Sequence, residues 1–216
     1  MESKIGRREM MGAAGTVLAA GTMAAATAQD AAPKMKVLGI NTSARKGKST
    51  AAALAICLEA VKEKNPAIET ELIELAELSI PAQLAAGQPL RPGETDDFPS
   101  VAAKLTDPAV VGIIVGSPVY FGNMSALCKA FIDRCTEFRR GFKLGNKVVG
   151  VVAVGGTRNG GQELTVQSIL VGMNGQNMFA VGTGQPSVRI GATLWNQGDS
   201  IAEDEFGVGT AKDLGH

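Results

Sequence analysis

The sequence predicts an α/β protein in which helices cover both faces of a parallel β-sheet. From Met35 onward, short apolar runs alternate repeatedly with longer segments of helical periodicity, which is the pattern of consecutive strand–helix units. Two of the runs, 109–117 and 147–156, are apolar along nearly their whole length, as expected for strands buried on both faces. The 216 residues are 45% hydrophobic and 19% charged, a composition typical of one globular domain.

The first strand is expected at 35–41 and the helix that follows it at 49–64, where apolar side chains recur along one face. Residues 68–75 alternate between polar and apolar side chains and are expected to form the second strand. A connection rich in proline and glycine then occupies 79–99. The remaining elements are expected to be a short helix at 100–105, a strand at 109–117, a helix at 125–138, a strand at 147–156, a helix at 161–171, a strand at 178–184 and a closing helix at 203–214.

The charge and the inventory of side chains argue against several functions. Lysine plus arginine and aspartate plus glutamate each total 21, so nothing in the charge favours nucleic acid as a partner. The single histidine is the last residue, His216, which argues against histidine-based metal sites and catalytic triads. Cys128 and Cys135 would lie roughly 10 Å apart along a helix, too far for a disulfide. We expect the three cysteines to be buried apolar filler.

The first 33 residues do not follow the pattern of the fold. Arg7 and Arg8 come shortly before an uncharged stretch rich in alanine, glycine and threonine, and Ala26-Thr27-Ala28 offers small residues for cleavage. This arrangement resembles a twin-arginine export signal. We therefore predict a signal peptide at 1–28, a linker at 29–34 and a periplasmic or otherwise exported domain at 35–216. An N-terminal helix or an uncleaved anchor that merely contains two arginines is the alternative.

Polar segments follow three of the predicted strands, at 41–50, 116–125 and 155–162. The carboxyl ends of parallel strands meet at one edge of the sheet, and ligands bind in a crevice beyond that edge. The sequence therefore predicts one binding site formed by these three loops.

The first of these segments has part of a nucleotide triphosphatase motif, because Gly47-Lys48-Ser49 is the end of GxxxxGK[ST]. The motif requires glycine at position 42, where this chain has Thr42. The two buried strands run into Gly-Ser and Gly-Gly rather than into the acid that helps to hold magnesium. Triphosphate hydrolysis is therefore disfavoured.

The same segment has groups that can bind a phosphate without a metal. Free N–H groups and the helix dipole favour an anion at the start of a helix, and hydrogen bonds to a charged group contribute about 1.5–3 kcal/mol each. The hydroxyls and cations around that start are Ser43, Arg45, Lys48, Ser49 and Thr50. An ordinary N-cap at Ser49 with a solvated basic turn explains the segment equally well.

The other two segments have groups suited to a flat ring. Tyr120 and Phe121 follow a rigid Ser-Pro pair at the end of a strand; they would form a wall beside a ring, or simply cap the core. The segment after the next strand is rich in glycine, so its backbone can approach a ligand closely, and it includes Arg158, Asn159 and Gln162.

Together the three segments resemble the flavodoxin-like NAD(P)H-dependent FMN reductase family, and within it the branch of iron–sulfur flavoproteins and multimeric-flavodoxin quinone reductases. The resemblance extends from about Lys34 to Gly215. It rests on SPVYFGNMSALCKAFIDR (117–134) and GGTRNGGQE (155–163), with NTSARKGKST (41–50) as a variant of the family's phosphate loop. It implies a doubly wound sheet of five parallel strands in the order 2-1-3-4-5, with helices on both faces.

The resemblance also implies which residues bind FMN. The phosphate would be held by Ser43, Arg45, Lys48, Ser49 and Thr50. One border of the isoalloxazine would be formed by Pro118, Val119, Tyr120, Phe121, Gly122 and Asn123, and the other by Gly156, Thr157, Arg158, Asn159 and Gly160. The flavin would perform the chemistry, so no catalytic side chain is required. Arg158 is expected to stabilise the negative charge that develops at the pyrimidine edge on reduction.

Two departures from the family pattern matter. Thr42 stands where glycine is usual, so a slightly different backbone path is expected there. The segment 76–94, where the iron–sulfur branch has clustered cysteines, has none, and thiolates are needed to hold such a cluster. We therefore expect neither an iron–sulfur centre nor another metal.

The expected function is that of an FMN-dependent oxidoreductase, which transfers electrons from NAD(P)H or another donor to a quinone or a similar small acceptor. The alternative is an exported electron carrier without nicotinamide-dependent turnover, because reduced nicotinamides are chiefly cytoplasmic. Cleavage after Ala28 removes three basic and two acidic residues and leaves a net charge of −1, which does not favour a carrier. By analogy with relatives, a homodimer or homotetramer is expected.

Two further features leave alternatives open. Trp195 could shield the flavin or lie in a subunit contact. Four cations gather around Phe138, namely Arg134, Arg139, Arg140 and Lys143. They could bind an anionic surface or a nicotinamide phosphate. The favoured interpretation is that they lie at a helix C-terminus, where the helix dipole favours cations.

Overall fold

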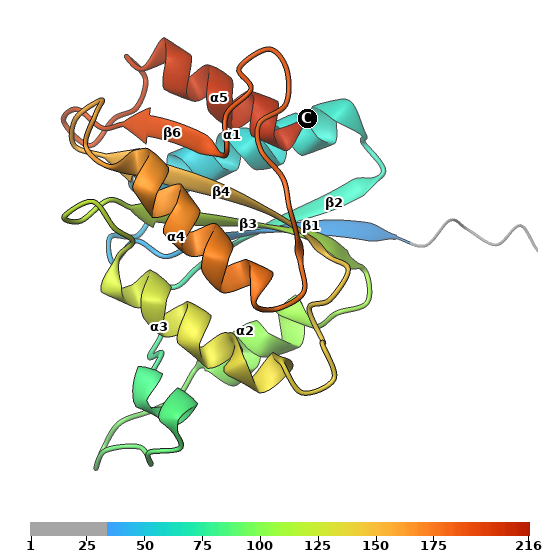
Figure 1. The fold of residues 1–216 in the computed structure, drawn as a ribbon, viewed down its shortest axis with the longest axis vertical. Coiled ribbons are helices and arrows are strands. Elements are labelled where there is room, and N and C mark those ends of the chain that lie inside the picture. Colours follow the sequence, from blue (N-terminus) through green and yellow to red (C-terminus); the bar gives the residue numbers. More distant parts are fainter. Residues whose placement is uncertain (1–33) are drawn as a thin grey trace, which may run out of the picture. The chain divides into compact units, whose positions relative to one another are not determined.

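The computed structural model describes residues 34–216 (Figure 1). The predicted signal peptide at 1–28, and the predicted linker apart from Lys34, lie outside the described residues. The described chain forms one parallel sheet in the order β2-β1-β3-β4-β5, in which β6 also pairs with β4. This order confirms the predicted doubly wound α/β fold.

Strands and helices alternate along the chain much as the sequence predicts. The strands are β1 (Met35–Asn41), β2 (Ile68–Glu74), β3 (Val110–Pro118), β4 (Val148–Gly155), β5 (Phe179–Ala180) and β6 (Ala192–Trp195). The helices are α1 (Ser49–Lys64), α2 (Phe98–Leu105), α3 (Ala126–Arg134), α4 (Gln162–Asn174) and α5 (Glu205–Gly215), with 3-10 helices η1 (Ala82–Ala86) and η2 (Cys135–Phe138). None of these helices is long and apolar enough to cross a membrane.

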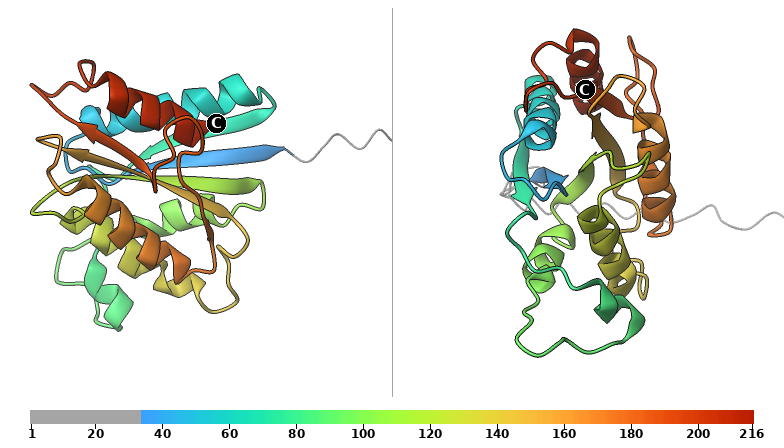
Figure 2. Two further views of the ribbon diagram at one scale, coloured as in Figure 1. Left: turned by 45° about the horizontal axis from the view of Figure 1, so that its top comes forward. Right: turned by 90° about the vertical axis from the view of Figure 1, so that its left-hand side faces the viewer.

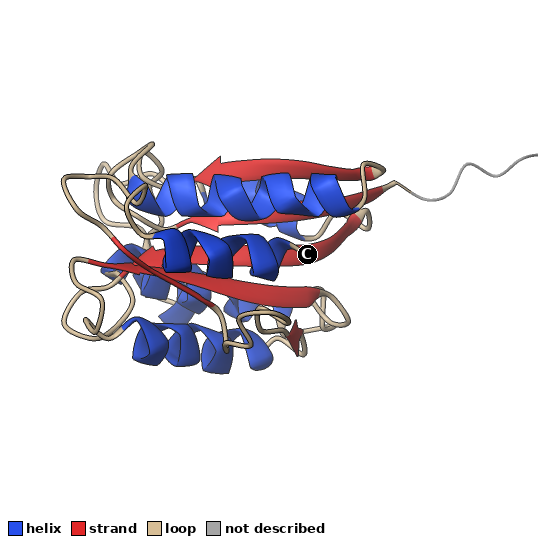
Figure 3. Ribbon diagram, turned by 90° about the horizontal axis from the view of Figure 1, so that it is seen from above, coloured by secondary structure: helices blue, strands red, loops and turns tan. Residues whose placement is uncertain are grey.

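Helices α1 and α5 cover one face of the sheet, and α2, α3 and α4 cover the other (Figures 1 and 2). Figure 3 looks onto the first face, where α5 lies beside α1. Successive side chains of a strand point to opposite faces, so Ile113 and Val115 of β3 pack in the cluster with α2, α3 and α4, whereas Ile114 packs in the cluster with α1 and α5. The run predicted to be a two-sided strand is therefore buried from both sides.

The fifth strand differs from the prediction. A single strand is predicted at 178–184. Instead, β5 consists of two residues and pairs with the start of β4, and β6 pairs with the carboxyl half of β4. Between them the chain leaves the sheet at Thr183, whose N–H donates to the carbonyl of Arg189 at 2.9 Å and whose hydroxyl accepts from the Arg189 N–H at 2.8 Å. Because these groups bond within the loop, they cannot continue the ladder along β4.

The helix predicted to begin at Ser125 is α3 followed by η2. Ser125 caps α3, since its hydroxyl oxygen accepts a hydrogen bond from the Cys128 N–H at 3.0 Å. Arg134, predicted to decorate the helix end, is instead buried. Its guanidinium donates to both carboxylate oxygens of Asp96, at 2.7 and 3.0 Å, and lies 4.6 Å from the centre of the Phe98 ring. Arg134 thus lies in the last turn of a helix, as predicted, but it is buried in an ion pair there.

Candidate functional site

Four loops meet at the edge of the sheet formed by the carboxyl ends of its strands, because β1, β3, β4 and β6 run parallel and end there (Figure 1). We call them the first loop (42–48), the second loop (119–125), the third loop (156–161) and the fourth loop (196–204). The first three are the loops predicted to form the site. The fourth was not predicted to contribute, because β6 was not predicted.

Thr42 fastens the first loop to β3. Its N–H and its hydroxyl both donate to the carbonyl oxygen of Gly116, at 2.9 and 2.8 Å. Its own carbonyl oxygen accepts from the hydroxyl of Ser125 at 2.8 Å. A glycine could not make the hydroxyl contact to Gly116, so the residue that departs from the family pattern joins the first loop to the end of β3.

The first loop leads into α1 without a capping side chain. Lys48 is the N-cap residue, and its side chain makes no hydrogen bond to the helix. Ser49 and Thr50 begin the helix and are 5% and 2% exposed. The first N–H groups of any helix lack partners within the helix, so this start offers N–H and hydroxyl donors to an anion.

The two predicted cations of the first loop contact a carboxylate of the fourth loop. Arg45 Nη1 lies 2.5 Å from Asp199 Oδ1, and Lys48 Nζ lies 3.5 Å from Asp199 Oδ2. The hydrogen bond from Arg45 lowers the pKa of Asp199, so this carboxylate is charged at neutral pH. Lys46, between the two cations in sequence, pairs instead with Glu77 at 2.6 Å. Arg45 and Lys48 therefore face one internal anion.

The second loop projects two aromatic side chains from a tight turn. Tyr120 and Asn123 exchange backbone hydrogen bonds of 2.9 and 3.1 Å, and Phe121 and Gly122 between them have φ of 52° and 72°, as in a type I′ turn. Phe121 is fully exposed and Tyr120 is half exposed. Neither side chain caps the core, so the turn presents apolar surface at the mouth of the site.

Gln162 holds the third loop in shape. Its amide nitrogen donates to the carbonyls of Thr157 and Leu194, at 2.6 and 3.1 Å. Its amide oxygen accepts from the N–H of Gly160 at 2.9 Å. Because Gln162 is itself buried, it links the third loop to β6 in a fixed position.

The second and third loops touch at two glycines. Gly161 has φ of 101°, and a Cβ added there would lie 2.6 Å from the Cα of Gly122. No side chain fits at this contact. Gly156, at the start of the third loop, has open space where a Cβ would point, so its backbone is accessible to a ligand.

Arg158, the predicted electrostatic stabiliser, lies on the third loop and forms an ion pair with Asp204. Its Nη1 also lies 3.4 Å from the carbonyl oxygen of Thr193. Asp204 is buried and accepts hydrogen bonds from the N–H groups of Trp195 and Gly207, both at 2.8 Å. The carboxylate thus fixes the guanidinium between the third and fourth loops, while the Arg158 side chain stays 39% exposed.

Asn196 presents a buried acceptor beside the third loop. Its backbone N–H donates to the carbonyl of Gly155 at 2.8 Å. Its side-chain oxygen is buried and has no hydrogen-bond partner within the described part of the chain. Since buried polar atoms nearly always have a partner, this oxygen is a candidate acceptor for an N–H of a ligand.

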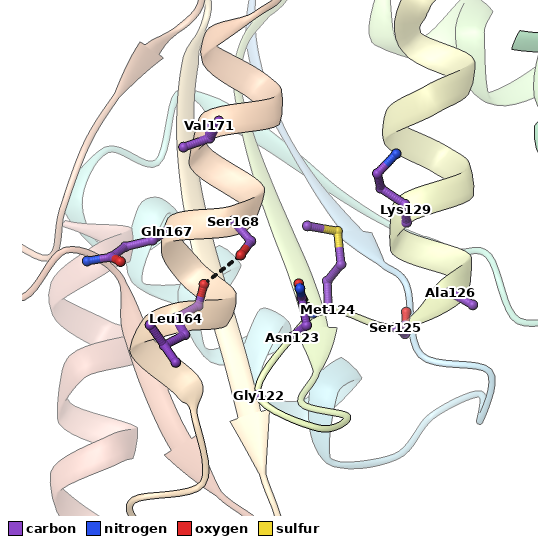
Figure 4. A pocket seen from close by; sticks show the side chains of 10 residues that line it. All are labelled: Gly122, Asn123, Met124, Ser125, Ala126, Lys129, Leu164, Gln167, Ser168 and Val171. Atoms are coloured by element: carbon purple, nitrogen blue, oxygen red, sulfur yellow. Dashed lines mark hydrogen bonds between the residues drawn. The ribbon is translucent and has the colours of Figure 1, made fainter. Parts of the chain in front are cut away.

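A hollow of about 840 Å³ adjoins the second loop (Figure 4). It lies between the start of α3 and the length of α4 from Leu164 to Val171, and the side chain of Met124 points into the space between these helices. Leu164 and Val171 line its α4 side and are 59% and 73% exposed. Within the described part of the chain, Lys129 is its one charged lining residue. The hollow therefore continues the apolar surface of the second loop.

Residues 34–216 contain no group of three or more histidine, cysteine, aspartate or glutamate side chains that could hold a metal ion. Cys57, Cys128 and Cys135 are free and buried. Burial raises the pKa of Cys57 and of Cys128 to about 12 and also raises the pKa of Cys135. The three thiols are therefore protonated at neutral pH and serve as apolar filler.

The structure brings the predicted residues of the first three loops to one edge, but the sequence did not predict the fourth loop, whose polar residues include Asn196, Asp199 and Asp204. A polar, turn-forming segment, NQGDS, directly follows the apolar residues 192–195. That pattern could have indicated a further strand and loop, but four residues are too short a run to stand out.

The profile of a family described as NADPH-dependent FMN reductase matches residues 35–193. An iron–sulfur flavoprotein of Methanocaldococcus jannaschii is 38% identical over 185 residues, which cover 84% of this chain and 94% of that protein. An NAD(P)H dehydrogenase (quinone) of Chromohalobacter salexigens is 33% identical over 118 residues, which cover 53% of this chain and 55% of that protein.

Among solved structures, the apo form of an NADH:FMN oxidoreductase matches with a TM-score of 0.60 at 17% identity, over 84% of this chain and 86% of that one. At this identity the likeness shows the fold alone. The family profile, by contrast, spans the first three loops and most of the described sheet. The chain therefore belongs to the NADPH-dependent FMN reductase family and is an oxidoreductase.

Proposed function

We propose that this protein binds FMN at the edge where the four loops meet and transfers electrons from NAD(P)H, or from another reduced donor, to a quinone or a similar small acceptor. The observation that carries the proposal is the meeting of an uncapped helix start, an exposed aromatic turn and an open glycine-rich loop at one edge. Membership of the family supports it. An electron carrier without nicotinamide-dependent turnover is the competing function.

The residues present fit FMN in four respects. The first loop and the start of α1 supply cations, hydroxyls and N–H groups for the phosphate, from Ser43, Arg45, Lys48, Ser49 and Thr50. The second loop supplies aromatic surface beside a ring, and the third supplies accessible backbone at Gly156. The side-chain oxygen of Asn196, which has no partner among residues 34–216, supplies an acceptor for a ring N–H.

A bound flavin would accept a hydride and release electrons singly or in pairs. The chain's own residues would position the ring and set the charge around it. Arg158 would place positive charge at the pyrimidine edge, and Asp204 would hold the guanidinium there through their ion pair. Tyr120 and Phe121 would cover the ring against water from the second loop. No side chain needs to act as an acid or a base.

The first test is cofactor retention. The purified protein is mixed with FMN, freed of excess flavin, and examined by visible absorption and by release of FMN on denaturation. We expect one FMN per chain. A colourless protein that retains no FMN would overturn the proposal and leave only a shared fold.

Turnover distinguishes the enzyme from the carrier. Oxidation of NADH and of NADPH by the FMN-loaded protein is followed with quinone acceptors, and free FMN at the same concentration is the control. We expect turnover above that of free FMN with at least one nicotinamide. Retained FMN without such turnover would favour the carrier.

We further propose that this chain carries no iron–sulfur cluster, although several relatives are named iron–sulfur flavoproteins. The segment 76–94 has no cysteine, and the three cysteines of the chain are buried in α1, α3 and η2. Iron and acid-labile sulfide should therefore be absent from protein purified without oxygen. Stoichiometric iron and sulfide would contradict this.

A homodimer or homotetramer is proposed as the working form. Support comes from the apolar surface formed by the exposed side chains of Phe121, Leu164 and Val171, which adjoin the hollow between α3 and α4. Analytical ultracentrifugation of the wild type and of Val171→Asp tests this. We expect an oligomer that the charged side chain weakens; a monomeric wild type would rule the proposal out.

We also propose that the protein is exported by the twin-arginine route, on the strength of Arg7, Arg8 and the small residues that end at Ala28. Replacement of both arginines by lysine should leave the full-length precursor in the cytoplasm, and mass spectrometry of the exported wild type should find Gln29 at its N-terminus. Unimpaired export of the lysine variant would contradict the assignment.

A further inference from the structure

A tight turn in the fourth loop fixes the position of Asp199. Gln197 and Ser200 exchange backbone hydrogen bonds of 2.9 and 3.0 Å. Gly198 and Asp199 between them have φ of 58° and 64°, and two consecutive residues at positive φ define a type I′ turn. Aspartate is one of the few residues other than glycine that tolerate this conformation. The turn therefore holds the Asp199 carboxylate beside the first loop.

Each oxygen of the Asp199 carboxylate contacts one of the two cations of that loop. Oδ1 accepts from Arg45 at 2.5 Å, and Oδ2 lies 3.5 Å from the ammonium of Lys48. These are the cations assigned to the phosphate of FMN. The neighbouring acids are used elsewhere: Glu77 pairs with Lys46, and Glu74 accepts from the N–H of Gly47 at 3.0 Å.

A ligand phosphate can replace Asp199 in its contacts with the two cations. The side chains of Arg45, Lys48 and Asp199 are 50%, 48% and 40% exposed, and ion pairs this accessible to water contribute little net stability. A phosphate monoester carries a charge of about −1.5 to −2 at neutral pH, whereas Asp199 carries one negative charge. The phosphate therefore attracts both cations more strongly than the carboxylate does.

We propose that Asp199 is an internal counter-ion that the phosphate of FMN must displace from Arg45 and Lys48, and that it thereby sets the affinity and selectivity of the first loop for dianionic phosphate monoesters. This inference rests on the proposed binding of FMN. With Asp199 in place, the two cations present a net charge of +1; with Asp199 displaced, they present +2 to the ligand. A weak or singly charged anion gains too little from the two cations to displace the carboxylate, so Asp199 protects the loop from such anions.

The test compares flavin affinity in two variants of the full-length protein that remove the same charge. Asp199→Asn removes the counter-ion and retains a residue that tolerates positive φ. Glu77→Gln removes an exposed acid that pairs with Lys46 on the same loop, and it serves as the matched control. Dissociation constants for FMN and for riboflavin, which lacks the phosphate, are measured on apoprotein by quenching of flavin fluorescence. Inorganic phosphate is then titrated as a competitor of FMN.

We expect Asp199→Asn to bind FMN about fivefold more tightly, in keeping with the loss of an exposed ion pair that competes with the ligand. Glu77→Gln should stay within about twofold of the wild type, riboflavin affinity should not change, and inorganic phosphate should compete more strongly in Asp199→Asn. Asp199→Gly, which also fits the turn, should behave like Asp199→Asn.

Three results would overturn the inference. Asp199→Asn could bind FMN no more tightly than the wild type, Glu77→Gln could show the same gain, or riboflavin could gain as much as FMN. In each of these cases the wild type still binds FMN, so the proposed function survives. If neither the wild type nor the variant binds FMN, the proposed function fails and this inference fails with it.

Discussion

The guanidinium of Arg134 and the carboxylate of Asp96 form a bidentate pair, with N–H···O distances of 2.7 and 3.0 Å, although the two residues are 38 positions apart. The side chains are 7% and 16% exposed. The pair joins α3 to the end of the long connection between β2 and α2. Asp97, the next residue, accepts from the N–H of Ser79 at 2.8 Å. These hydrogen bonds hold the end of the connection against α3 and against the start of the connection at Ser79.

Replacement of Asp96 by asparagine should lower the free energy of unfolding by about 2–3 kcal/mol, because it leaves the buried guanidinium of Arg134 with only the longer carboxylate contact to Glu137 at 3.8 Å. Urea denaturation measures the change. Asp133→Asn is the matched control, since Asp133 pairs with Lys129 at an exposed position, where such pairs contribute about 0.5 kcal/mol or less. Equal losses in the two variants would contradict a special role for the buried pair.

The same pair should make stability depend on pH. The hydrogen bonds from Arg134 lower the pKa of Asp96, so folding favours the charged carboxylate. Its contribution is complete above the unfolded-state pKa of about 4 and is lost as pH falls through the lower folded-state pKa. The difference in unfolding free energy between the wild type and Asp96→Asn should be constant from pH 7 to 5 and should shrink below pH 4. A difference that grew on acidification would reverse the assigned direction.

Two glycines of α5 should respond oppositely to alanine. Gly209 has open space where a Cβ would point, so Gly209→Ala should stabilise the protein by about 0.5–1 kcal/mol through helix propensity. A Cβ at Gly207 would instead collide with the carboxylate of Asp204, which caps α5 by accepting from the Gly207 N–H. Gly207→Ala should therefore destabilise the protein. Thermal unfolding of both variants checks this; the same sign in both would contradict it.

Substitutions at two glycines of the third loop should separate an effect on folding from an effect on cofactor binding. Gly161→Ala should lower the melting temperature, because the alanine has both an unfavourable φ and a collision with Gly122. Gly156→Ala meets no protein atom and should leave the melting temperature of the apoprotein unchanged. It should weaken FMN binding, because the methyl group would occupy space proposed for the ring. Unchanged FMN affinity in Gly156→Ala would place the ring elsewhere.

Arg158 should influence the flavin reduction potential. Arg158→Ala removes a positive charge and leaves the buried carboxylate of Asp204 uncompensated, and both effects disfavour added electrons. We expect the two-electron potential to fall by about 30 mV, equivalent to about 1.4 kcal/mol. Arg189→Ala is the control, because Arg189 lies on the same Phe206 ring at 5.6 Å but is not part of the proposed site. An unchanged potential in Arg158→Ala would remove Arg158 from this role.

The positions of β3 and β4 could be predicted from the sequence because each is a long apolar run with a helix after it, whereas the order of the strands came from the family resemblance. Residues 109–117 and 147–156 differ from β3 and β4 by only a residue or so at each end. Local periodicity was enough there, since it reports burial directly. Periodicity did not predict β5 and β6. β5 has two residues and β6 has four, and both pair with β4. Neither run is long enough to show a period.

The candidate site could be predicted only as far as it depends on local sequence. Helix starts and glycine turns are local, so the first three loops were expected. Contacts between residues far apart in the sequence could not be predicted from any local pattern. Asp199 reaches Arg45 across 154 positions, and Asp204 binds Arg158 from the far side of a strand that was not predicted. The sequence placed Arg134 at a helix C-terminus but did not show its partner Asp96 for the same reason.

The interrupted strand beside β4 has a consequence for how this chain can change over evolution. Since β5 and β6 each pair with β4 independently, residues 183–190 can lengthen, shorten or be exchanged at the modest entropic cost of a different loop length. Such a change would leave the carboxyl ends of the strands, where the four loops meet, in register. Lineages can therefore acquire new contacts at 183–190 by insertion while the residues of the four loops stay in place.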